Sequence, residues 1–373
     1  MKYIKTFSNH SEYTQYKDGG GYITPNLSYC VQENEAHFNK YVRDYSKEYF
    51  TIEALEDGDV YFKYQEWNPI ETQRYMEYSK DGGETWVRTT NVDNEEVVMD
   101  IPMSEGEIAL VRGDNDTLAS YKEDDDTYYN PFFYSDTEFS VYGNIMSLIH
   151  GDDFIGETTV TEYMFYSLFY DVYGAEFDTP LKCLIINAEN LILPATTLAS
   201  SCYNSMFRNC TSLTTAPELP ATTLAINCYA SMFYGCRSLT TAPELPATTL
   251  ASSCYNSMFG NCTSLTTAPE LPAITLVNGC YGYMFSGCTG LTTAPELPAI
   301  TLVNGCYGYM FQNCSSLNYI KAMFTTQPST SFTRDWVSGV SSTGTFVKNS
   351  SATWNVTGSY GVPSGWTVQT ASA

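Results

Sequence analysis

The second half of the chain contains five blocks of 26 residues that follow one another without an insertion. Each block repeats the same apolar residues at the same spacing. These are Leu198, Leu224, Leu250, Leu276 and Leu302; Cys202, Cys228, Cys254, Cys280 and Cys306; a Met-Phe pair starting at Met206, Met232, Met258, Met284 and Met310; and Cys210, Cys236, Cys262, Cys288 and Cys314. A stacked repeat buries its apolar residues only against its neighbours, so one extra residue would move every later one out of line. The constant period predicts a solenoid.

The spacing inside one block predicts a short helix. Leu250, Cys254 and Met258 lie at i, i+4 and i+8, which would place them on one face of a helix over residues 251–261. A helix this short is marginal alone, so its apolar face must pack on neighbouring blocks. The segment 268–272 holds two prolines, which cannot donate backbone hydrogen bonds. We therefore expect the parallel strand of each block to be short.

Each block also carries the run Phe-x-(Gly/Asn)-Cys-x-x-Leu, at residues 207–213, 233–239, 259–265, 285–291 and 311–317. This run resembles the BspA-like leucine-rich repeats of gut bacteria and their phages. The blocks differ from that pattern in a methionine before the phenylalanine, a proline in the strand segment and a somewhat longer repeat. The resemblance implies a leucine-rich-repeat solenoid of short helices and short strands.

We predict a multi-domain, mainly β chain in five parts. They are an N-terminal attachment segment (1–45), a β-sandwich (46–145), an N-terminal cap with a degenerate first repeat (146–197), five repeats (198–320) and a β-rich C-terminal cap (321–373). The sandwich is expected because β-branched and aromatic residues alternate between turn signals in five runs. These runs are Phe50–Leu55, Asp59–Tyr64, Tyr75–Tyr78, Trp86–Thr89 and Glu96–Asp100. Residues 164–169 resemble part of a repeat, and an open solenoid end needs such a cap.

The N-terminal segment suggests where the protein acts. The runs Glu12–Tyr13, Thr24–Tyr29 and Glu35–Asn39 look like a segment that recurs on virion proteins of crAss-like and other Bacteroides phages. Residues 1–10 lack the apolar core of a secretory signal, and no later stretch is apolar enough for a membrane helix. We expect a virion protein assembled in the bacterial cytoplasm, without membrane insertion; the alternative location is the bacterial cell surface.

Charge is divided sharply along the chain. The whole chain has 42 acidic and 18 basic residues, of which residues 181–373 hold six of each, so residues 1–180 hold 36 and 12. The entire net charge of −24 therefore falls on the first half. Such a surface repels phosphate backbones, and we expect no nucleic-acid partner.

Ten of the twelve cysteines belong to the repeats. Equivalent cysteines in stacked blocks would lie about 4.8 Å apart, farther than the Cβ separation that a disulfide prefers. A zinc site is not expected either, because each pair is spaced Cys-x7-Cys and the chain has only three histidines. We expect reduced cysteines that act as small core residues.

One short motif could suggest an enzyme. Ser79, Asp81, Gly83 and Trp86 belong to an Asp-box, Ser-x-Asp-x-Gly-x-Thr-Trp, of the kind known from sialidases. Sialidases carry several boxes, an arginine cluster and a tyrosine nucleophile, whereas this chain has one box without that context. We interpret it as a structural hairpin in which Asp81 caps its own turn.

No other motif predicts catalysis. The acidic clusters Asp114–Asp116 and Glu123–Asp126 lack the spacing of an EF-hand, so we interpret them as solvated loops rather than calcium sites. The repeated glutamates of the Ala-Pro-Glu-Leu-Pro turn are interpreted as turn residues. We expect no enzymatic activity, no metal and no cofactor.

The blocks differ mainly at two positions of the predicted helix, which the period places toward solvent. One position holds Ser205, Ser231, Ser257, Tyr283 and Tyr309; the other holds Arg208, Tyr234, Gly260, Ser286 and Gln312. Exposed tyrosines give large contact area at low entropic cost. Drift on a solvated face is the alternative explanation for any one residue. We take Arg208, Tyr234, Tyr283, Tyr309 and Gln312 as the candidate ligand-binding surface.

Together these observations predict a phage tail or head fibre-like protein. Its N-terminal segment would bind other virion proteins, its solenoid a host-surface glycan or protein, and it could form a homo-oligomer. The alternative is a bacterial surface adhesin of the BspA-like class. A glycan depolymerase is a further alternative, supported only by the single Asp-box.

Overall fold

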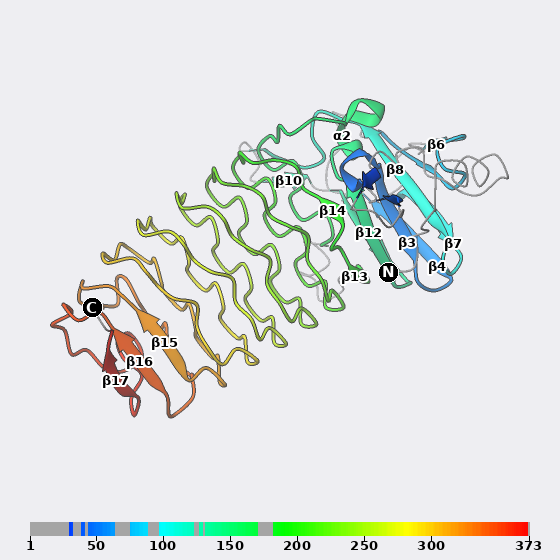
Figure 1. Cartoon of the computed structure of the whole chain (residues 1–373). Coiled ribbons are helices and arrows are strands. Elements are labelled where there is room, and N and C mark those ends of the chain that lie inside the picture. Colours follow the sequence, from blue (N-terminus) through cyan, green and yellow to red (C-terminus); the bar gives the residue numbers. More distant parts are fainter. Residues whose placement is uncertain are drawn as a thin grey trace.

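The computed structural model describes residues 30–32, 39–41, 44–63, 75–88, 97–122, 127–129, 131–170 and 182–371. Paired sheets lie at one end, a row of stacked coils follows, and a small sheet holds the C-terminal end (Figure 1). The strands of the first part are β1 (Cys30–Gln32), β2 (Asn39–Tyr41), β3 (Phe50–Ala54), β4 (Gly58–Lys63), β5 (Tyr75–Ser79), β6 (Val87–Arg88), β7 (Val97–Met103), β8 (Ile108–Asp114), β9 (Ser120–Lys122), β10 (Thr127–Tyr129), β11 (Phe132–Ser135) and β12 (Phe139–Asn144). The remaining elements are the helices η1 (Tyr45–Lys47), α2 (Ser147–His150) and η2 (Gly151–Asp153), and the strands β13 (Ile185–Asn187), β14 (Leu191–Ile192), β15 (Tyr319–Ala322), β16 (Thr345–Lys348) and β17 (Thr367–Thr370).

Two sheets pack face to face in the first part. One has the order β13-β12-β3-β8-β5-β6, with β14 also paired to β12, and the other has the order β11-β4-β7. Phe50 of β3 meets Phe133 of β11 with ring centroids 5.5 Å apart, and Phe62 of β4 packs on the same ring. All three side chains are buried. The five runs predicted as strands overlap β3 to β7 in order, and the two layers form a β-sandwich.

The N-terminal attachment segment lies mostly outside the described residues. Of its strands, the structure describes β1 and β2, which pair antiparallel with Val31 opposite Lys40. The acidic run 123–126, between β9 and β10, also lies outside the described residues.

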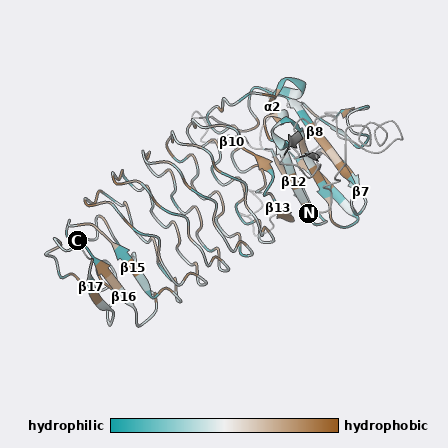
Figure 2. Ribbon diagram, viewed as in Figure 1, coloured by the Kyte–Doolittle hydropathy of each residue, from teal (hydrophilic) through white to brown (hydrophobic). Residues whose placement is uncertain are grey.

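The sandwich continues into the repeats without a break at residue 145. The last strand of the sandwich, β12, pairs in parallel with β13 and β14, which belong to the predicted cap. Phe169 stacks on Phe133 on one side and on Phe207 of the first repeat on the other, at 5.8 and 5.0 Å. A single apolar cluster therefore runs from Phe50 of the sandwich to Trp366 near the C-terminus. Hydrophobic residues recur in the coils and in the sheets at both ends (Figure 2).

The predicted helix of each block is wrong. Residues 251–261 form a chain of tight turns. Every second amide, from Cys254 to Gly260, bonds the carbonyl three residues earlier, as in Met258 to Tyr255 at 3.2 Å. The alternate amides instead bond the next coil, as in Phe259 to Met284 at 2.9 Å. No helix is assigned anywhere in the described residues 198–320.

A residue with positive φ at every fourth position produces this ladder of turns. In the third block these residues are Ser253, Ser257 and Asn261, with φ of 52°, 56° and 58°. The equivalent residues are Ser201, Ser205, Asn209, Asn227, Ser231, Gly235, Gly279, Tyr283, Gly287, Gly305, Tyr309 and Asn313. Glycine and asparagine tolerate this left-handed conformation best. Because the turn unit is four residues long, it places the apolar residues at i, i+4 and i+8 just as a helix would.

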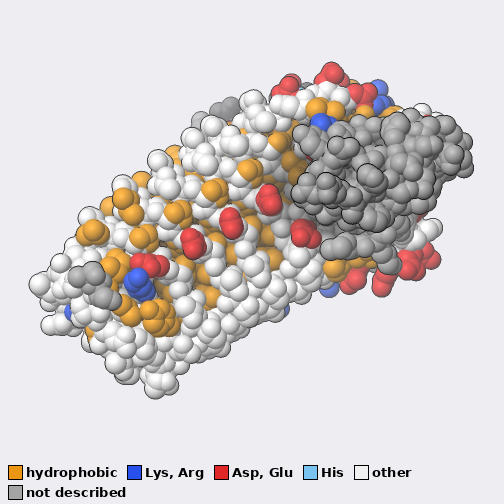
Figure 3. Space-filling model, viewed as in Figure 1, with side chains coloured by type: hydrophobic (Ala, Val, Ile, Leu, Met, Phe, Trp, Pro, Cys, Tyr) orange, Lys and Arg blue, Asp and Glu red, His pale blue; other side chains and the backbone are white. Residues whose placement is uncertain are grey.

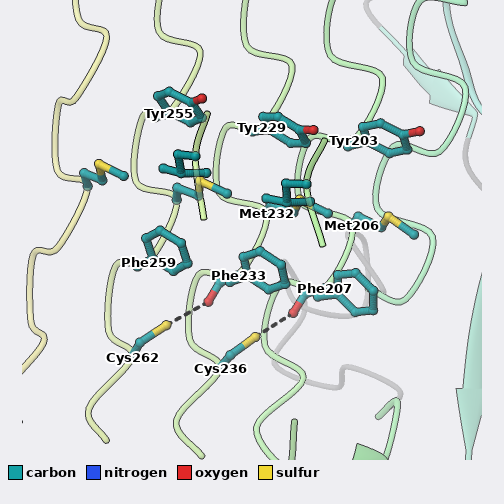
Figure 4. Packing of buried hydrophobic residues seen from close by; sticks show 14 of the residues in the cluster. Tyr203, Met206, Phe207, Tyr229, Met232, Phe233, Cys236, Tyr255, Phe259 and Cys262 are labelled. Atoms are coloured by element: carbon teal, nitrogen blue, oxygen red, sulfur yellow. Dashed lines mark hydrogen bonds between the residues drawn. The ribbon is translucent and has the colours of Figure 1, made fainter. Parts of the chain in front are cut away.

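Successive coils place equivalent side chains in register (Figure 4). The ring of Phe233 lies 5.5 Å from Phe207 and 5.7 Å from Phe259, and Tyr229 lies between Tyr203 and Tyr255 in the same way. All of these rings are buried. We call residues 198–320, with this packing, the repeat stack.

The parallel strand of each block shrinks to isolated bridges. Thr223 bridges Thr197 and Thr249, and Thr241 bridges Thr267, all in parallel. The prolines that follow Thr267 lack the N–H groups that a longer ladder needs. The strand of each block is thus as short as predicted, since only single bridges remain.

Further coils continue the repeats at both ends. Before the first block, the Phe165 amide donates to the carbonyl of Cys202, so residues 164–169 pair with the first block as successive coils pair with each other. After the fifth block, Tyr309 donates to Arg334 and Phe311 to Trp336, so the repeats do not end at residue 320 as expected. The parallel sheet β15-β16-β17 then closes the stack, consistent with the predicted β-rich cap.

Candidate ligand-binding surface

The two variable positions form two rows along the outside of the turn ladder. We call the first, with Ser205, Ser231, Ser257, Tyr283 and Tyr309, the first outer row; all five have positive φ. The second outer row holds Arg208, Tyr234, Gly260, Ser286 and Gln312. Most of these side chains are half-buried, but Tyr283 is exposed, whereas Ser205 and Gly260 are buried. The expectation that both positions face solvent is therefore wrong for Ser205 and Gly260.

The structure brings Tyr283 and Tyr309 together. Their rings stack nearly parallel, with centroids 4.3 Å apart and an interplanar angle of 12°. The guanidinium of Arg334, from the coil after Tyr309, lies 5.8 Å from the Tyr309 ring centroid. Partial burial raises the pKa of Tyr283, and the neighbouring Tyr309 raises it further. The result is a stacked aromatic pair at the surface of the repeat stack.

Arg208 and Tyr234 form a separate group that is built into the coils. The Arg208 guanidinium lies over the rings of Tyr170 and Tyr234, at 5.3 and 4.6 Å. The Tyr234 hydroxyl accepts a hydrogen bond from Asn261 at 2.6 Å. A Cβ added to Gly260 would stand 2.7 Å from the Tyr234 ring, so this ring lies directly over the glycine. Both residues thus have packing roles that explain their presence without a ligand.

Gln312 belongs to the second outer row, two coils beyond Gly260. Its side chain is half-buried, and its backbone carbonyl accepts from Gly287 at 2.7 Å. It does not lie in the row of the Tyr283 and Tyr309 pair. The five candidates therefore fall into an aromatic pair, a cation and ring group, and a separate glutamine.

Sequence reasoning missed four residues near the aromatic pair. Arg334 lies beyond the predicted end of the repeats. Recognising a sixth block with altered residues would have revealed it. Asn256 lies against Gly282, since its Nδ2 would be 2.8 Å from a Cβ added there. In the fourth and fifth blocks, Gly282 and Gly308 each precede the tyrosine, a pairing that the sequence does contain.

The Asp-box forms the predicted hairpin between β5 and β6, where Tyr78 pairs with Val87. Asp81 accepts from the Thr85 amide at 2.9 Å, from the Thr85 hydroxyl at 2.5 Å and from the Ser79 hydroxyl at 2.7 Å. These hydrogen bonds hold the pKa of Asp81 well below its usual range. Gly82 and Gly83 take φ of 77° and 92°, and the Gly83 amide donates to Ser79. The Asp81 carboxylate thus stabilises its own turn through these three hydrogen bonds.

Trp86 connects this hairpin to the sandwich. The Arg112 guanidinium lies 3.9 Å from its ring centroid, and Tyr49 packs edge-on at 5.2 Å. Arg112 also pairs with Glu77 at 2.9 Å and with Asp152 at 2.5 Å. Burial raises the pKa of Tyr49 to about 12, and its hydrogen bond to Asp152 adds to that shift. All of these groups are engaged with one another.

Glutamates mark another face of the repeat stack. Glu218, Glu244, Glu270 and Glu296 are exposed, and acidic side chains form a row across this face in Figure 3. Lys321 ends the row with an ion pair to Glu296 at 2.9 Å. Asp114 and Asp116 are exposed as well, and no cluster of three or more potential metal ligands occurs in the described part of the chain. Among the described residues, no helix is long and apolar enough to span a membrane.

The cysteines lie inside the coils. All eleven whose side chains are described are buried, and none of them forms a disulfide. The Sγ of Cys236, Cys262, Cys288 and Cys314 each donates to the carbonyl of a phenylalanine in the preceding coil, at 3.0–3.1 Å. Figure 4 shows two of these hydrogen bonds. Only a protonated thiol can donate in this way, so the geometry fits the reduced state.

The stacked coils of 26 residues define the region as a leucine-rich-repeat array. Residues 200–335 match the family model described as the BspA type leucine-rich repeat region, in six copies. This stretch is therefore a BspA-type repeat region, and the match extends past residue 320 into the coil that contains Arg334. No curated protein and no solved structure matches the chain.

Proposed function

We propose that the protein is a non-enzymatic binding protein whose repeat stack holds a host-surface glycan or protein. The observation that carries this proposal is the pair Tyr283 and Tyr309, two stacked rings on the outside of an otherwise serine-bearing row. The BspA-type match supports a surface-binding role in general. The Asp-box supports no depolymerase, because Asp81 is occupied by its own turn.

We further propose that the protein is carried on a phage virion as a tail or head fibre-like appendage. The support is the resemblance of the N-terminal runs to virion proteins. A bacterial surface adhesin is the second candidate, favoured by the repeat family itself. Gold-labelled antibodies would separate the two: label on phage particles is expected, and label confined to the cell envelope would favour the adhesin.

Binding can be tested with the complete, fluorescently labelled chain and a panel of Bacteroides strains. We expect the chain to bind at least one strain and the double variant Tyr283→Ser, Tyr309→Ser to lose binding. Serine is the residue of the first three blocks at this position, so folding should persist. Glu270→Gln on the glutamate row is the matched control and should bind normally. Equal binding by the wild type and the double variant would refute the role of the aromatic pair.

A further inference from the structure

The stacked pair in the first outer row leaves one face of Tyr283 open. Because Tyr283 and Tyr309 come from consecutive coils and stack face to face, their rings continue along the direction in which coils are added. Tyr309 is covered by Tyr283 on one side and by Arg334 on the other. The second face of Tyr283 points toward the coil of Ser257, where the row has only a hydroxymethyl group. Tyr283 accordingly keeps 40% of its surface exposed.

Polar groups border this open face. The Ser257 hydroxyl donates to the Asn256 side chain at 2.9 Å, and the Asn256 amide lies over Gly282, next to Tyr283 in the chain. A Cβ at residue 282 would meet that amide at 2.8 Å, so the glycine makes room for it. A ring stacked on Tyr283 would thus meet a hydroxyl and an amide beside it.

The surroundings carry no charge on the open side. The charged groups that influence the Tyr283 hydroxyl, Arg334 and Asp335, belong to the coil beyond Tyr309. The residues from 181 to 373 hold equal numbers of acidic and basic side chains. The ligand that fits such a surface is neutral, with a flat apolar face and a polar rim.

The backbone conformation at Tyr283 and Tyr309 is unusual for tyrosine. Tyr283 and Tyr309 have φ of 57° and 58°, whereas the other left-handed positions of the repeat stack hold serine, asparagine or glycine. A bulky residue in this region is strained, so the backbone conformation disfavours tyrosine relative to glycine at both positions. The backbone conformation therefore does not explain why the fourth and fifth blocks have tyrosines.

We propose that the open face of Tyr283 is a subsite for a neutral pyranose of a host-surface glycan. The inference rests on the proposed binding function and specifies its ligand class. A pyranose has an apolar C–H face that stacks on an aromatic ring, and hydroxyls at its edge that match Ser257 and Asn256. A protein partner would need a wider apolar patch around the ring, with charged and polar groups only at the rim.

A glycan array carrying neutral oligosaccharides of glucose, galactose and mannose tests this subsite with the full-length chain. We expect the wild type to bind a neutral oligosaccharide, Tyr283→Ser to weaken that binding about tenfold, and Tyr283→Phe to retain it. Ile274→Thr is the matched control, because Ile274 is exposed on the same coil and Thr248 holds its place in the preceding block. The control should bind like the wild type.

Two further probe sets on the array decide the ligand class: sialylated or uronate-containing glycans, and aromatic-rich peptides. Binding to only one of these sets, or to no probe, would overturn the inference, as would undiminished binding by Tyr283→Ser. If the chain still binds Bacteroides cells in that case, the proposed function stands and only the pyranose subsite fails. If the cells are not bound either, both fail.

Discussion

The sandwich and the repeat stack satisfy their backbone hydrogen bonds in different ways. In the sandwich, β3 lies between β8 and β12, so its partners come from distant parts of the chain. In the repeat stack, alternate amides bond a carbonyl 25 residues ahead, as in Tyr255 to Cys280. A sandwich must form as a whole, whereas a stack is a sum of similar interfaces between neighbours. The two regions should therefore lose structure by different routes.

Their ionisable groups differ as well. Two surface carboxylates of the first part, Asp152 and Glu107, have lowered pKa values owing to hydrogen bonds with Tyr49 and Lys80. Burial partly offsets this effect and is the largest single contribution at Glu107. The repeat stack instead buries two rows of thiols. Burial raises the pKa of Cys254 and Cys262 from 9.0 to about 12.

The largest effect that we predict is alkaline unfolding of the repeat stack. An unfolded thiol loses its proton near pH 9, whereas the folded one keeps it to about pH 12, so the stability that is present below pH 9 falls between these values. Each such thiol loses about 1.4 kcal/mol per pH unit in that range. Several thiols together exceed the roughly 5–15 kcal/mol of a typical domain. Denaturant titrations at pH 8, 9, 10 and 11 measure the loss.

Iodoacetamide labelling with peptide mapping locates this unfolding, because the labelled cysteines report directly on the repeat stack. Stability that stays level from pH 8 to pH 11 would contradict the prediction. The lowered pKa values of Asp152 and Glu107 have the opposite consequence: the stability that they contribute is present at neutral pH and lost as the pH falls through the acid range.

Removing one core ring should affect a small part of the repeat stack but the whole of the sandwich. Phe259→Ala in the repeat stack and Phe133→Ala in the sandwich should each cost about 3–5 kcal/mol, since both rings are buried between aromatic neighbours. Hydrogen exchange should rise only in coils near Phe259 in the first variant but throughout the sandwich in the second. Thr248→Ala, at an exposed position, is the control. Exchange that rises equally in both regions would show that the molecule unfolds as one unit.

The smallest effect tests the turn ladder itself. Ser253→Gly should stabilise the protein by about 1 kcal/mol, because Ser253 has a φ of 52° that glycine adopts without a steric penalty. Gly279 already holds this position in the next block. Ser264→Gly is the matched control: Ser264 has no positive φ, so the added chain entropy should destabilise. Destabilisation by both changes, measured by urea denaturation, would favour the helix over the turns.

Much of the fold could be predicted, since the period fixes which residues stack. The strands of the sandwich and the Asp-box hairpin also followed from alternation and turn residues. The helix prediction failed because a turn unit of four residues and a helix share the i, i+4 spacing of apolar residues. The signal that separates them is serine, asparagine or glycine at every fourth position, as at Ser253, Ser257 and Asn261.

The site was predictable only in part. Tyr283 and Tyr309 stand out because other blocks have serine in their place, but their stacking depends on coil spacing that the sequence does not give. Arg334 was missed because Phe332 and Trp336 replace the cysteine and methionine of its block, which hid the sixth repeat. Tyr234 was assigned to the surface because the contact with Gly260 involves a neighbouring coil.

The uniform joint between coils also affects how such a gene can change. Every coil offers its neighbours the same turn carbonyls and the same rings, so duplicating or deleting one unit of 26 codons creates a joint like those already present. Length can therefore vary in whole units by recombination between the near-identical repeats, while both end structures remain unaltered. Each duplication would also copy one side chain of the outer row, so that a lineage could lengthen or shorten its run of tyrosines without redesigning the protein.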